Sequence, residues 1–426
     1  MSTHSFTDKD KHWFEENVLD RFLRYVRMDT TADGHAKTSP STPGQLELGR
    51  LLVGELTALG VEGAVMDDGG FVFASLPGNL PAGVQGVPEI AFMAHLDTSP
   101  AAPGKNVKPL VHRDYDGEAI RLPGGPVLDP ETSPELKDYR GKTLITSDGT
   151  TLLGGDDKAG IAEIMTALEY LRDHPRIAHA PLQVIFTPDE ELGLSMERFP
   201  VEKFSARYGY TIDGGNQGHI EAECFEAIKA KVTFRGVSIH TGSARGRLVN
   251  AVEMAARYVG LLPGAESPQA TDGRYGFYVP MEIRGNVEDA EVEVFLRDFE
   301  EAEVKRRADV LKKMARAVEA LHPGGHVKVK LKKQYANMHK YLTGDPRVLG
   351  LLEEAVRATG IEPVREIIRG GTDGARLSEL GIPSPNVFTG VHNMHSRTEW
   401  AALEAMVRAS QTVVGLARLW AERGGA

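Results

Sequence analysis

The sequence predicts an α/β protein with a mostly parallel sheet and flanking helices, interrupted by a smaller inserted α+β domain. Apolar runs of strand length alternate with amphipathic helices in the first half of the chain, which is typical of a parallel sheet covered by helices. From about Cys224 the pattern changes to β-α-β-β-α-β, the order of a ferredoxin-like unit. After Tyr335 the α/β pattern resumes.

The chain length supports two domains, because 426 residues exceed what one hydrophobic core usually serves. We place a discontinuous α/β domain at residues 1–222 and 336–426 and the inserted domain at residues 223–335. The formal charge of -11 argues against nucleic acid as a partner, since phosphate binding requires a basic surface. No apolar stretch approaches the roughly 18 residues of a membrane span, and the first twenty residues contain no secretory signal, so we expect no membrane partner.

Hydrophobic periodicity places the individual elements. In the α/β part, the predicted strands cover residues 90–94, 182–186, 208–212 and 386–389, and the predicted helices cover residues 159–174, 348–359 and 403–423. In the inserted part, the predicted strands cover residues 225–235, 277–284, 292–299 and 326–332, and the predicted helices cover residues 248–262 and 300–321.

Each predicted strand of the α/β part is followed by acidic or histidine side chains. These are His95 and Asp97, Glu190 and Glu191, Asp213, and His392 and His395. A further acidic pair, Asp156 and Asp157, follows two glycines. Residues placed just after several strands of an open α/β sheet converge at one edge, where such sheets bind ligands. Together these side chains are what a two-metal hydrolase needs.

The acidic pairs suit different tasks in such a site. Asp97 lies two residues from His95, and a carboxylate there can accept the second N–H of a metal-binding imidazole. Asp156 and Asp157 would start a helix, where an ordinary N-cap explains one of them but not both. Of the adjacent Glu190 and Glu191, one can bind metal while the other transfers protons. A solvated acidic turn is the alternative for that pair, and spacing alone does not separate His392 from His395.

Five segments resemble the M20 metallopeptidase family, and within it the tripeptide aminopeptidases, over nearly the whole chain. These segments are residues 95–100, 152–160, 186–191, 212–215 and 369–374. The resemblance implies a zinc-peptidase catalytic domain that holds two Zn²⁺ ions. His95 and Asp213 would bind one ion, Glu191 and His395 would bind the other, and Asp156 would bridge them. It also implies a cis peptide bond between Asp156 and Asp157.

The same resemblance implies further roles. Glu190 would be the general base and Asp97 the carboxylate that orients His95. The inserted domain would act as a lid, with His240 stabilising the oxyanion. Arg297, Asn250 and Arg369 would bind the polar ends of the peptide. From the residues alone, His240 is a loop residue, Arg297 could pair with a carboxylate, and Asn250 could be a polar helix residue. Residues before Asn17 and residues 194–199 depart from the family pattern and stay unassigned.

The expected activity is removal of the N-terminal residue from tripeptides, with small peptides as substrates. An M20-type dipeptidase or N-acyl amino acid deacylase with the same metal site is the alternative, and a non-catalytic metal-binding protein is a further one. The single cysteine, Cys224, excludes an intrachain disulfide and fits a reducing compartment, so we expect a cytoplasmic protein. The sequence leaves monomer and homodimer both open.

Overall fold

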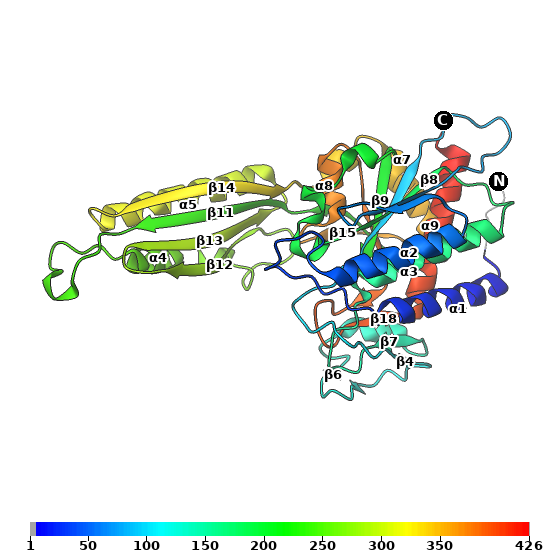
Figure 1. The fold of residues 1–426 in the computed structure, drawn as a ribbon, viewed down its shortest axis with the longest axis horizontal. Coiled ribbons are helices and arrows are strands. Elements are labelled where there is room, and N and C mark those ends of the chain that lie inside the picture. The colour runs from blue at the N-terminus through cyan, green and yellow to red at the C-terminus, as the bar shows by residue number, and fades with distance from the viewer. Residues whose placement is uncertain (1–5, 426) are drawn as a thin grey trace. The chain divides into compact units, whose positions relative to one another are not determined.

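The computed structural model describes residues 6–425 and divides into two compact units (Figure 1). Of the described residues, the first unit contains 6–222, 341–366 and 372–425. The second contains residues 223–340 and the short segment 367–371. Among the described residues, no helix is long and apolar enough to cross a membrane.

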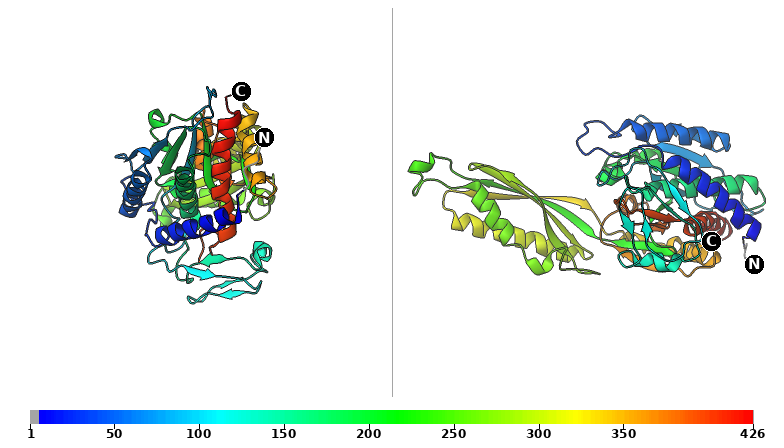
Figure 2. Two further views of the ribbon diagram at one scale, coloured as in Figure 1. Left: turned by 90° about the vertical axis from the view of Figure 1, so that its right-hand side faces the viewer. Right: turned by 90° about the horizontal axis from the view of Figure 1, so that it is seen from below.

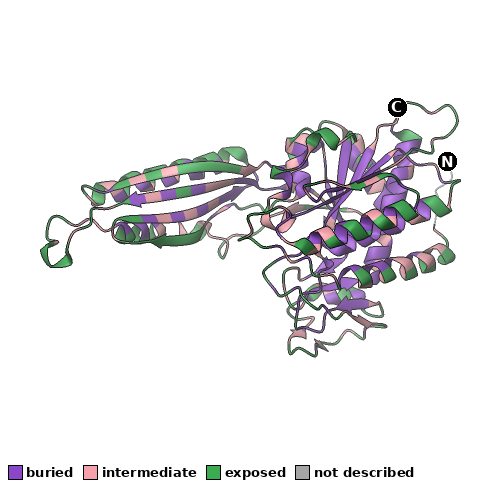
Figure 3. Cartoon of the chain, viewed as in Figure 1, coloured by how far each residue is buried: buried purple, intermediate pink, exposed green. Residues whose placement is uncertain are grey.

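An eight-stranded sheet forms the centre of the first unit, in the order β1-β2-β8-β3-β9-β16-β10-β15. Its strands are β1 (Glu62–Met66), β2 (Val72–Leu76), β3 (Ile90–His95), β8 (Leu182–Thr187), β9 (Tyr208–Gly214), β10 (His219–Cys224), β15 (Val364–Ile368) and β16 (Asn386–Phe388). Every residue of β3 and β8 is buried, as expected for strands covered on both faces (Figure 3).

The sheet is mixed, which corrects the prediction of a mostly parallel one. The central strands β8, β3, β9 and β16 are parallel, whereas β1, β2 and β8 pair antiparallel at one side and β10 pairs antiparallel with β16. A tight turn explains the antiparallel pairing of β1 and β2, because the Asp67 carboxylate accepts the backbone N–H groups of Gly69 and Phe71.

Helices cover both faces of this sheet. They are α1 (Asp8–Tyr25), α2 (Pro43–Ala58), α3 (Gly155–Asp173), α7 (Pro346–Ala358), α8 (Asp373–Glu379) and α9 (Leu403–Arg423); the short α6 (His339–Leu342) spans the point in the sequence where the second unit ends and the first resumes. Helix α3 packs on β3 and β9 and also contacts α1 and α9, and α1 crosses α9 (Figure 2). On the other face, Leu377 of α8 belongs to a core cluster with Ala91 and Met93 of β3.

Smaller elements complete the first unit. A four-stranded sheet contains β4 (Leu110–His112), β7 (Leu144–Thr146), β17 (Val391–His392) and β18 (Trp400–Ala402), and a two-stranded sheet contains β5 (Ile120–Arg121) and β6 (Val127–Leu128). Short 3₁₀ helices in the two units are Pro134–Tyr139, Glu190–Leu192, Ser195–Glu197, Val201–Lys203, Thr241–Ser243 and Gly264–Glu266.

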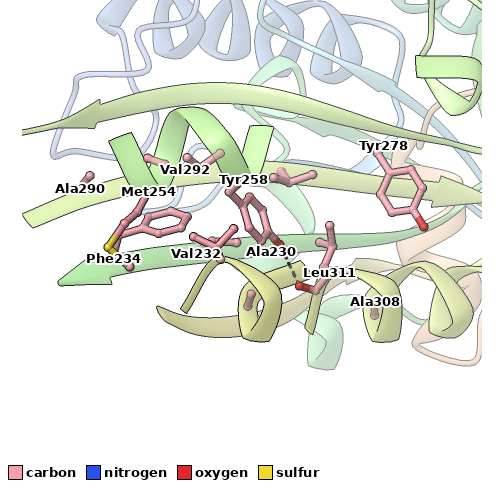
Figure 4. Packing of buried hydrophobic residues seen from close by; sticks show 14 of the residues in the cluster. Ala230, Val232, Phe234, Met254, Tyr258, Tyr278, Ala290, Val292, Ala308 and Leu311 are labelled. Atoms are coloured by element: carbon pink, nitrogen blue, oxygen red, sulfur yellow. Dashed lines mark hydrogen bonds between the residues drawn. The ribbon is translucent and has the colours of Figure 1, made fainter. Parts of the chain in front are cut away.

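The second unit has the element order β-α-β-β-α-β. It contains β11 (Glu226–Arg235), α4 (Ala251–Gly260), β12 (Phe277–Gly285), β13 (Asp289–Asp298), α5 (Glu301–Leu321) and β14 (His326–Tyr335). The antiparallel sheet has the order β12-β13-β11-β14. Its core packs strand residues such as Phe234 and Val292 against both helices, and the Tyr258 hydroxyl donates to the Leu311 carbonyl at 3.2 Å (Figure 4).

Candidate metal centre

The parallel strands bring the predicted side chains to one edge of the sheet. His95 is the last residue of β3, Asp213 is the penultimate residue of β9, and Glu190 follows β8 after a short turn. Because β3 is parallel to both β8 and β9, their carboxyl ends lie together. Asp156 comes from the first turn of α3, which packs on β3 and β9.

Two groups of potential metal ligands share the carboxylate of Asp156. The first group is His95, Asp156 and Asp213, and the second is Asp156, Glu191 and His395. Within each group, the ligand atoms lie within 4.8 Å of one another. Asp156 Oδ1 lies 2.8 Å from His95 Nε2, and Asp156 Oδ2 lies 3.0 Å from His395 Nε2. One carboxylate therefore presents one oxygen to each group.

Asp97 is fully buried behind the first group. Nδ1 of His95, the ring nitrogen that faces away from Asp156, lies 3.0 Å from the backbone carbonyl oxygen of Asp97 and 3.3 Å from one carboxylate oxygen of Asp97. Its two carboxylate oxygens also accept the backbone N–H groups of Glu190 at 3.0 Å and Glu191 at 3.1 Å. Asp97 thus contacts the imidazole and the turn that carries both glutamates.

The two glutamates differ in their surroundings. Glu191 Oε1 lies 3.0 Å from His395 Nε2 and belongs to the second group. Glu190 belongs to neither group. Burial raises the pKa of both carboxyls; the nearby His95 opposes the shift for Glu190, and the neighbouring His395 opposes it for Glu191. Burial likewise raises the pKa of Asp213 to about 6, again opposed by His95.

Asp157 and His392 lie outside both groups. The Asp157 carboxylate turns toward backbone and accepts the N–H groups of His95 at 3.1 Å and Gly160 at 3.2 Å. The peptide bond between Asp156 and Asp157 is cis, which confirms what the resemblance implied. The His392 ring stacks on Trp400 at 4.0 Å between centroids and is buried. The structure thus separates His392 from His395, which the spacing did not.

The ligand groups fit divalent cations. Glu190, Glu191 and Asp213 are half-buried residues whose carboxyl groups have raised pKa values, and a bound cation would favour their ionised forms. In the described structure, His395 Nε2 forms its hydrogen bond with Asp156. Glu191 Oε1 also lies 3.0 Å from His395 Nε2, but it has no hydrogen-bond partner among the described residues. Imidazole and carboxylate donors are the ligands of catalytic Zn²⁺ sites.

The four predicted substrate-binding or lid residues belong to the second unit, and the described ligand groups contain none of them. His240 is exposed, and its Nδ1 accepts the N–H of Gly242 at 3.1 Å. Asn250 is the N-cap of α4 and accepts the N–H of Val252 at 2.9 Å, so its side chain has a structural role that the sequence analysis did not assign.

The two arginines of this set are engaged within their own unit. Arg297 is buried, donates to Gln334 Oε1 at 2.8 Å and to two carbonyl groups, and lies over the rings of Phe295 and Tyr335. Arg369 donates to the carbonyl groups of Thr271, Gly273 and Tyr275 at 2.7 to 3.1 Å. To bind a peptide, either guanidinium group would have to give up some of these hydrogen bonds or form further ones.

Three carboxylates that support the site were not identified from the sequence. Asp189 accepts the N–H of Ser41 at 2.9 Å and the side-chain amide of Gln45 at 2.9 Å, just before Glu190. Asp373 accepts the Thr187 hydroxyl at 2.8 Å. Glu399 contacts the loop that carries Asp156. Their partners are backbone amides and common polar side chains, which leave no recognisable spacing in a sequence.

An α/β sheet whose parallel strands end at two groups of metal-ligand side chains is the architecture of a metal-dependent hydrolase. The chain belongs to the peptidase family M20/M25/M40, whose family model matches residues 146–419. It is 46% identical to a protein named Peptidase T from Listeria monocytogenes serotype 4b (strain F2365), over 411 residues that cover 96% of this chain and 100% of that protein.

Two solved structures share the fold over almost the whole chain. One is aminopeptidase PepT from Bacillus cereus ATCC 10987, with a TM-score of 0.73 and 24% identity over 96% of this chain and 99% of that one. The other is a tripeptidase from Staphylococcus aureus subsp. aureus mu50, with a TM-score of 0.75 and 21% identity over the same shares of both chains. At these identities, the likeness supports the fold.

Proposed function

We propose that the chain is a tripeptide aminopeptidase that releases the N-terminal residue with the help of two bound Zn²⁺ ions. Family membership and 46% identity to a Peptidase T over its full length support the reaction class. The observation that carries the proposal is the shared position of Asp156, which presents one oxygen to His95 and the other to His395. A bridging carboxylate is what a site for two neighbouring cations requires.

The proposed ligand assignment follows the two groups. His95 and Asp213 would hold one ion, Glu191 and His395 would hold the other, and Asp156 would contact both. Bound in this way, the ions would supply a hydroxide nucleophile near neutral pH and polarise the peptide carbonyl. Asp97 would keep the His95 ring oriented, since its backbone carbonyl lies 3.0 Å and its carboxylate 3.3 Å from Nδ1.

Glu190 would be the general base. It stands next to the proposed ligand Glu191 but lies outside both ligand groups. Its lone pairs therefore stay available to take a proton from the attacking water and return it to the leaving amine. The bond from Glu190 N–H to Asp97 fixes the backbone from which this side chain extends.

The substrate contacts remain part of the proposal. His240 would stabilise the oxyanion, and Asn250, Arg297 and Arg369 would hold the polar ends of the peptide. Residues 1–222 and 336–426 would form the catalytic domain, and residues 223–335 would form a lid. We also propose a cytoplasmic location, which the single buried cysteine Cys224 supports, and a monomer or homodimer.

A cleavage assay tests the proposal. Zinc-loaded protein would be incubated with matched di-, tri- and tetrapeptides and an N-acetylated tripeptide, and the products identified by mass spectrometry. Release of the N-terminal residue from the free tripeptide alone, abolished by Glu190→Ala, would support it. Cleavage of the dipeptide or the acetylated peptide would be consistent with the same metal site but would indicate another M20 activity, that of a dipeptidase or an N-acyl amino acid deacylase. A Glu190→Ala variant with unchanged behaviour would support a non-catalytic metal-binding protein.

A further inference from the structure

The Glu399 carboxylate is buried beneath the candidate metal centre, with 1% of the residue exposed. It accepts three backbone N–H groups from one short loop. Oε2 accepts those of Leu153 at 2.8 Å and Gly154 at 2.9 Å, and Oε1 accepts that of Asp156 at 3.1 Å. A carboxylate that accepts several amide N–H groups makes charge-assisted hydrogen bonds, which are stronger than neutral ones.

The glycines of this loop permit the close approach. Gly154 has a φ of 78°, a left-handed conformation that glycine adopts without strain. A Cβ atom at Gly155 would lie 3.0 Å from Val391 and 3.2 Å from Glu399 Oε1, closer than side chains normally pack. The backbone that leads into Asp156 can therefore reach the carboxylate.

Glu399 also belongs to the loop that carries His395. Within that loop, the Glu399 N–H donates to the Ser396 carbonyl at 3.3 Å, and the Ser396 hydroxyl donates to the Asn393 carbonyl at 2.7 Å. Asn393 in turn donates to the Ser133 hydroxyl at 2.8 Å. These hydrogen bonds fix the conformation of the turn that contains His395, four residues before Glu399.

We propose that Glu399 is a positioning residue that fixes the Asp156 backbone relative to the His395 loop before metal binds. The inference rests on the proposed function, because it assumes that Asp156 and His395 are ligands. Glu399 would not touch metal or substrate and would act through Asp156. The ion held by Asp156, Glu191 and His395 would depend on it most, since two of its three ligands are connected through Glu399.

Glu399→Gln is the informative variant. A glutamine has one acceptor oxygen and an NH₂ group that would face an amide donor, so it cannot accept from all three N–H groups. Glu404→Gln is the matched control. Glu404 is a half-buried glutamate whose carboxylate, like that of Glu399, accepts a backbone N–H, here that of Thr143 just before β7, at 3.2 and 3.3 Å.

The test is calorimetric titration of Zn²⁺ into metal-free wild type, Glu399→Gln and Glu404→Gln, with thermal unfolding of each metal-free protein. We expect two zinc ions per wild-type chain, a loss of about 10- to 100-fold in affinity for at least one of them in Glu399→Gln, and wild-type affinity in Glu404→Gln. Wild-type affinity in a folded Glu399→Gln overturns the inference, even if its metal-free melting temperature falls, since that fall alone marks a purely structural role. A wild-type chain that binds no zinc overturns the proposed function as well.

A measurement on the unmodified chain covers the case in which Glu399→Gln does not fold. Hydrogen exchange of the amides at Leu153, Gly154 and Asp156 would be followed in the metal-free and zinc-loaded wild type. If Glu399 organises the loop in advance, these amides are already protected by at least 10-fold without metal. Exchange at unprotected rates in the metal-free protein, with protection only after zinc is added, would overturn the inference.

Discussion

Asp97 accepts the backbone N–H of Glu190 at 3.0 Å, and its carboxylate also lies 3.3 Å from Nδ1 of His95. One buried side chain therefore connects a proposed metal ligand on β3 to the proposed base after β8. Neither contact involves a reacting atom. Replacing Asp97 therefore tests how strongly activity and metal binding depend on a residue that is not itself a proposed metal ligand.

Asp97→Asn should weaken both activity and metal binding. Asparagine offers one acceptor oxygen in place of two, and its NH₂ group would face either an amide donor or the imidazole N–H. We expect kcat/KM and zinc affinity to fall by about 10- to 100-fold. Steady-state kinetics and zinc titration measure the two effects. Asp116→Asn is the control, because Asp116 accepts the Glu118 N–H in an exposed turn; an equal loss there would rule out a specific role for Asp97.

The adjacent glutamates should separate catalysis from metal binding. Glu190→Gln should retain two zinc ions and lose about 10²- to 10⁴-fold in kcat, because it removes a proton acceptor outside the ligand groups. Glu191→Gln should lower the zinc content, since Glu191 lies in the second group. Metal analysis beside kinetics distinguishes the two. Loss of zinc in Glu190→Gln would assign that residue to the ligands.

Much of the α/β framework was predictable, because buried strands and amphipathic helices have clear periodicities. The predicted helix at residues 403–423 matches α9, and the predicted strand at 225–235 matches β11 within one residue. The predicted start of α3 at residue 159 agrees with the regular part of that helix, because Asp156 and Asp157 near its beginning have non-helical backbone angles.

The segments left unassigned show the limits of sequence patterns. Residues 194–199 contain Ser195, whose hydroxyl donates to Asp373, and Met196 and Phe199, which lie in the core next to β2 and β8. The small sheet of β4, β7, β17 and β18 has strands of two or three residues, too short for alternation to be visible. Glu399 could not be found because its partners are backbone amides.

The N-terminal helix α1 should contribute to stability. Phe14 is fully buried and stacks near Tyr170 of α3, with 4.6 Å between ring centroids. Phe14→Ala should lower the free energy of unfolding by about 3 to 5 kcal/mol, the usual cost of deleting a buried aromatic side chain. Trp13→Ala, at a half-buried neighbouring position, should cost less. Denaturant unfolding would measure both, and equal small effects would show that α1 is dispensable.

Glu163 should make stability depend on pH. It is fully buried in α3, and neither carboxylate oxygen has a hydrogen-bond partner in the described structure. Burial raises its pKa well above the usual range, so the folded chain holds a proton that the unfolded chain releases above its pKa of 4.5. The native state is therefore penalised increasingly as pH rises from 4.5 through the folded pKa.

Replacing Glu163 with glutamine removes that penalty. Glu163→Gln should be more stable than wild type at pH 8, by on the order of 1 kcal/mol, and should show a smaller gain at pH 4.5. Melting temperatures of both proteins across this range test the sign. The exposed Glu47→Gln in α2 should show no such trend. A gain of equal size at both pH values would exclude the titration of Glu163 as its cause.

Because Asp156 belongs to both ligand groups and Asp213 to only one, replacing them should change the zinc content to different extents. Asp156→Asn replaces a carboxylate that contacts both histidines, at 2.8 Å and 3.0 Å, so both ions should bind more weakly and the zinc content should fall below one per chain. Asp213→Asn alters only the group with His95, so about one ion should remain. Metal analysis after dialysis against a weak chelator compares them. Equal retention of zinc in the two variants would mean that Asp156 does not serve both groups.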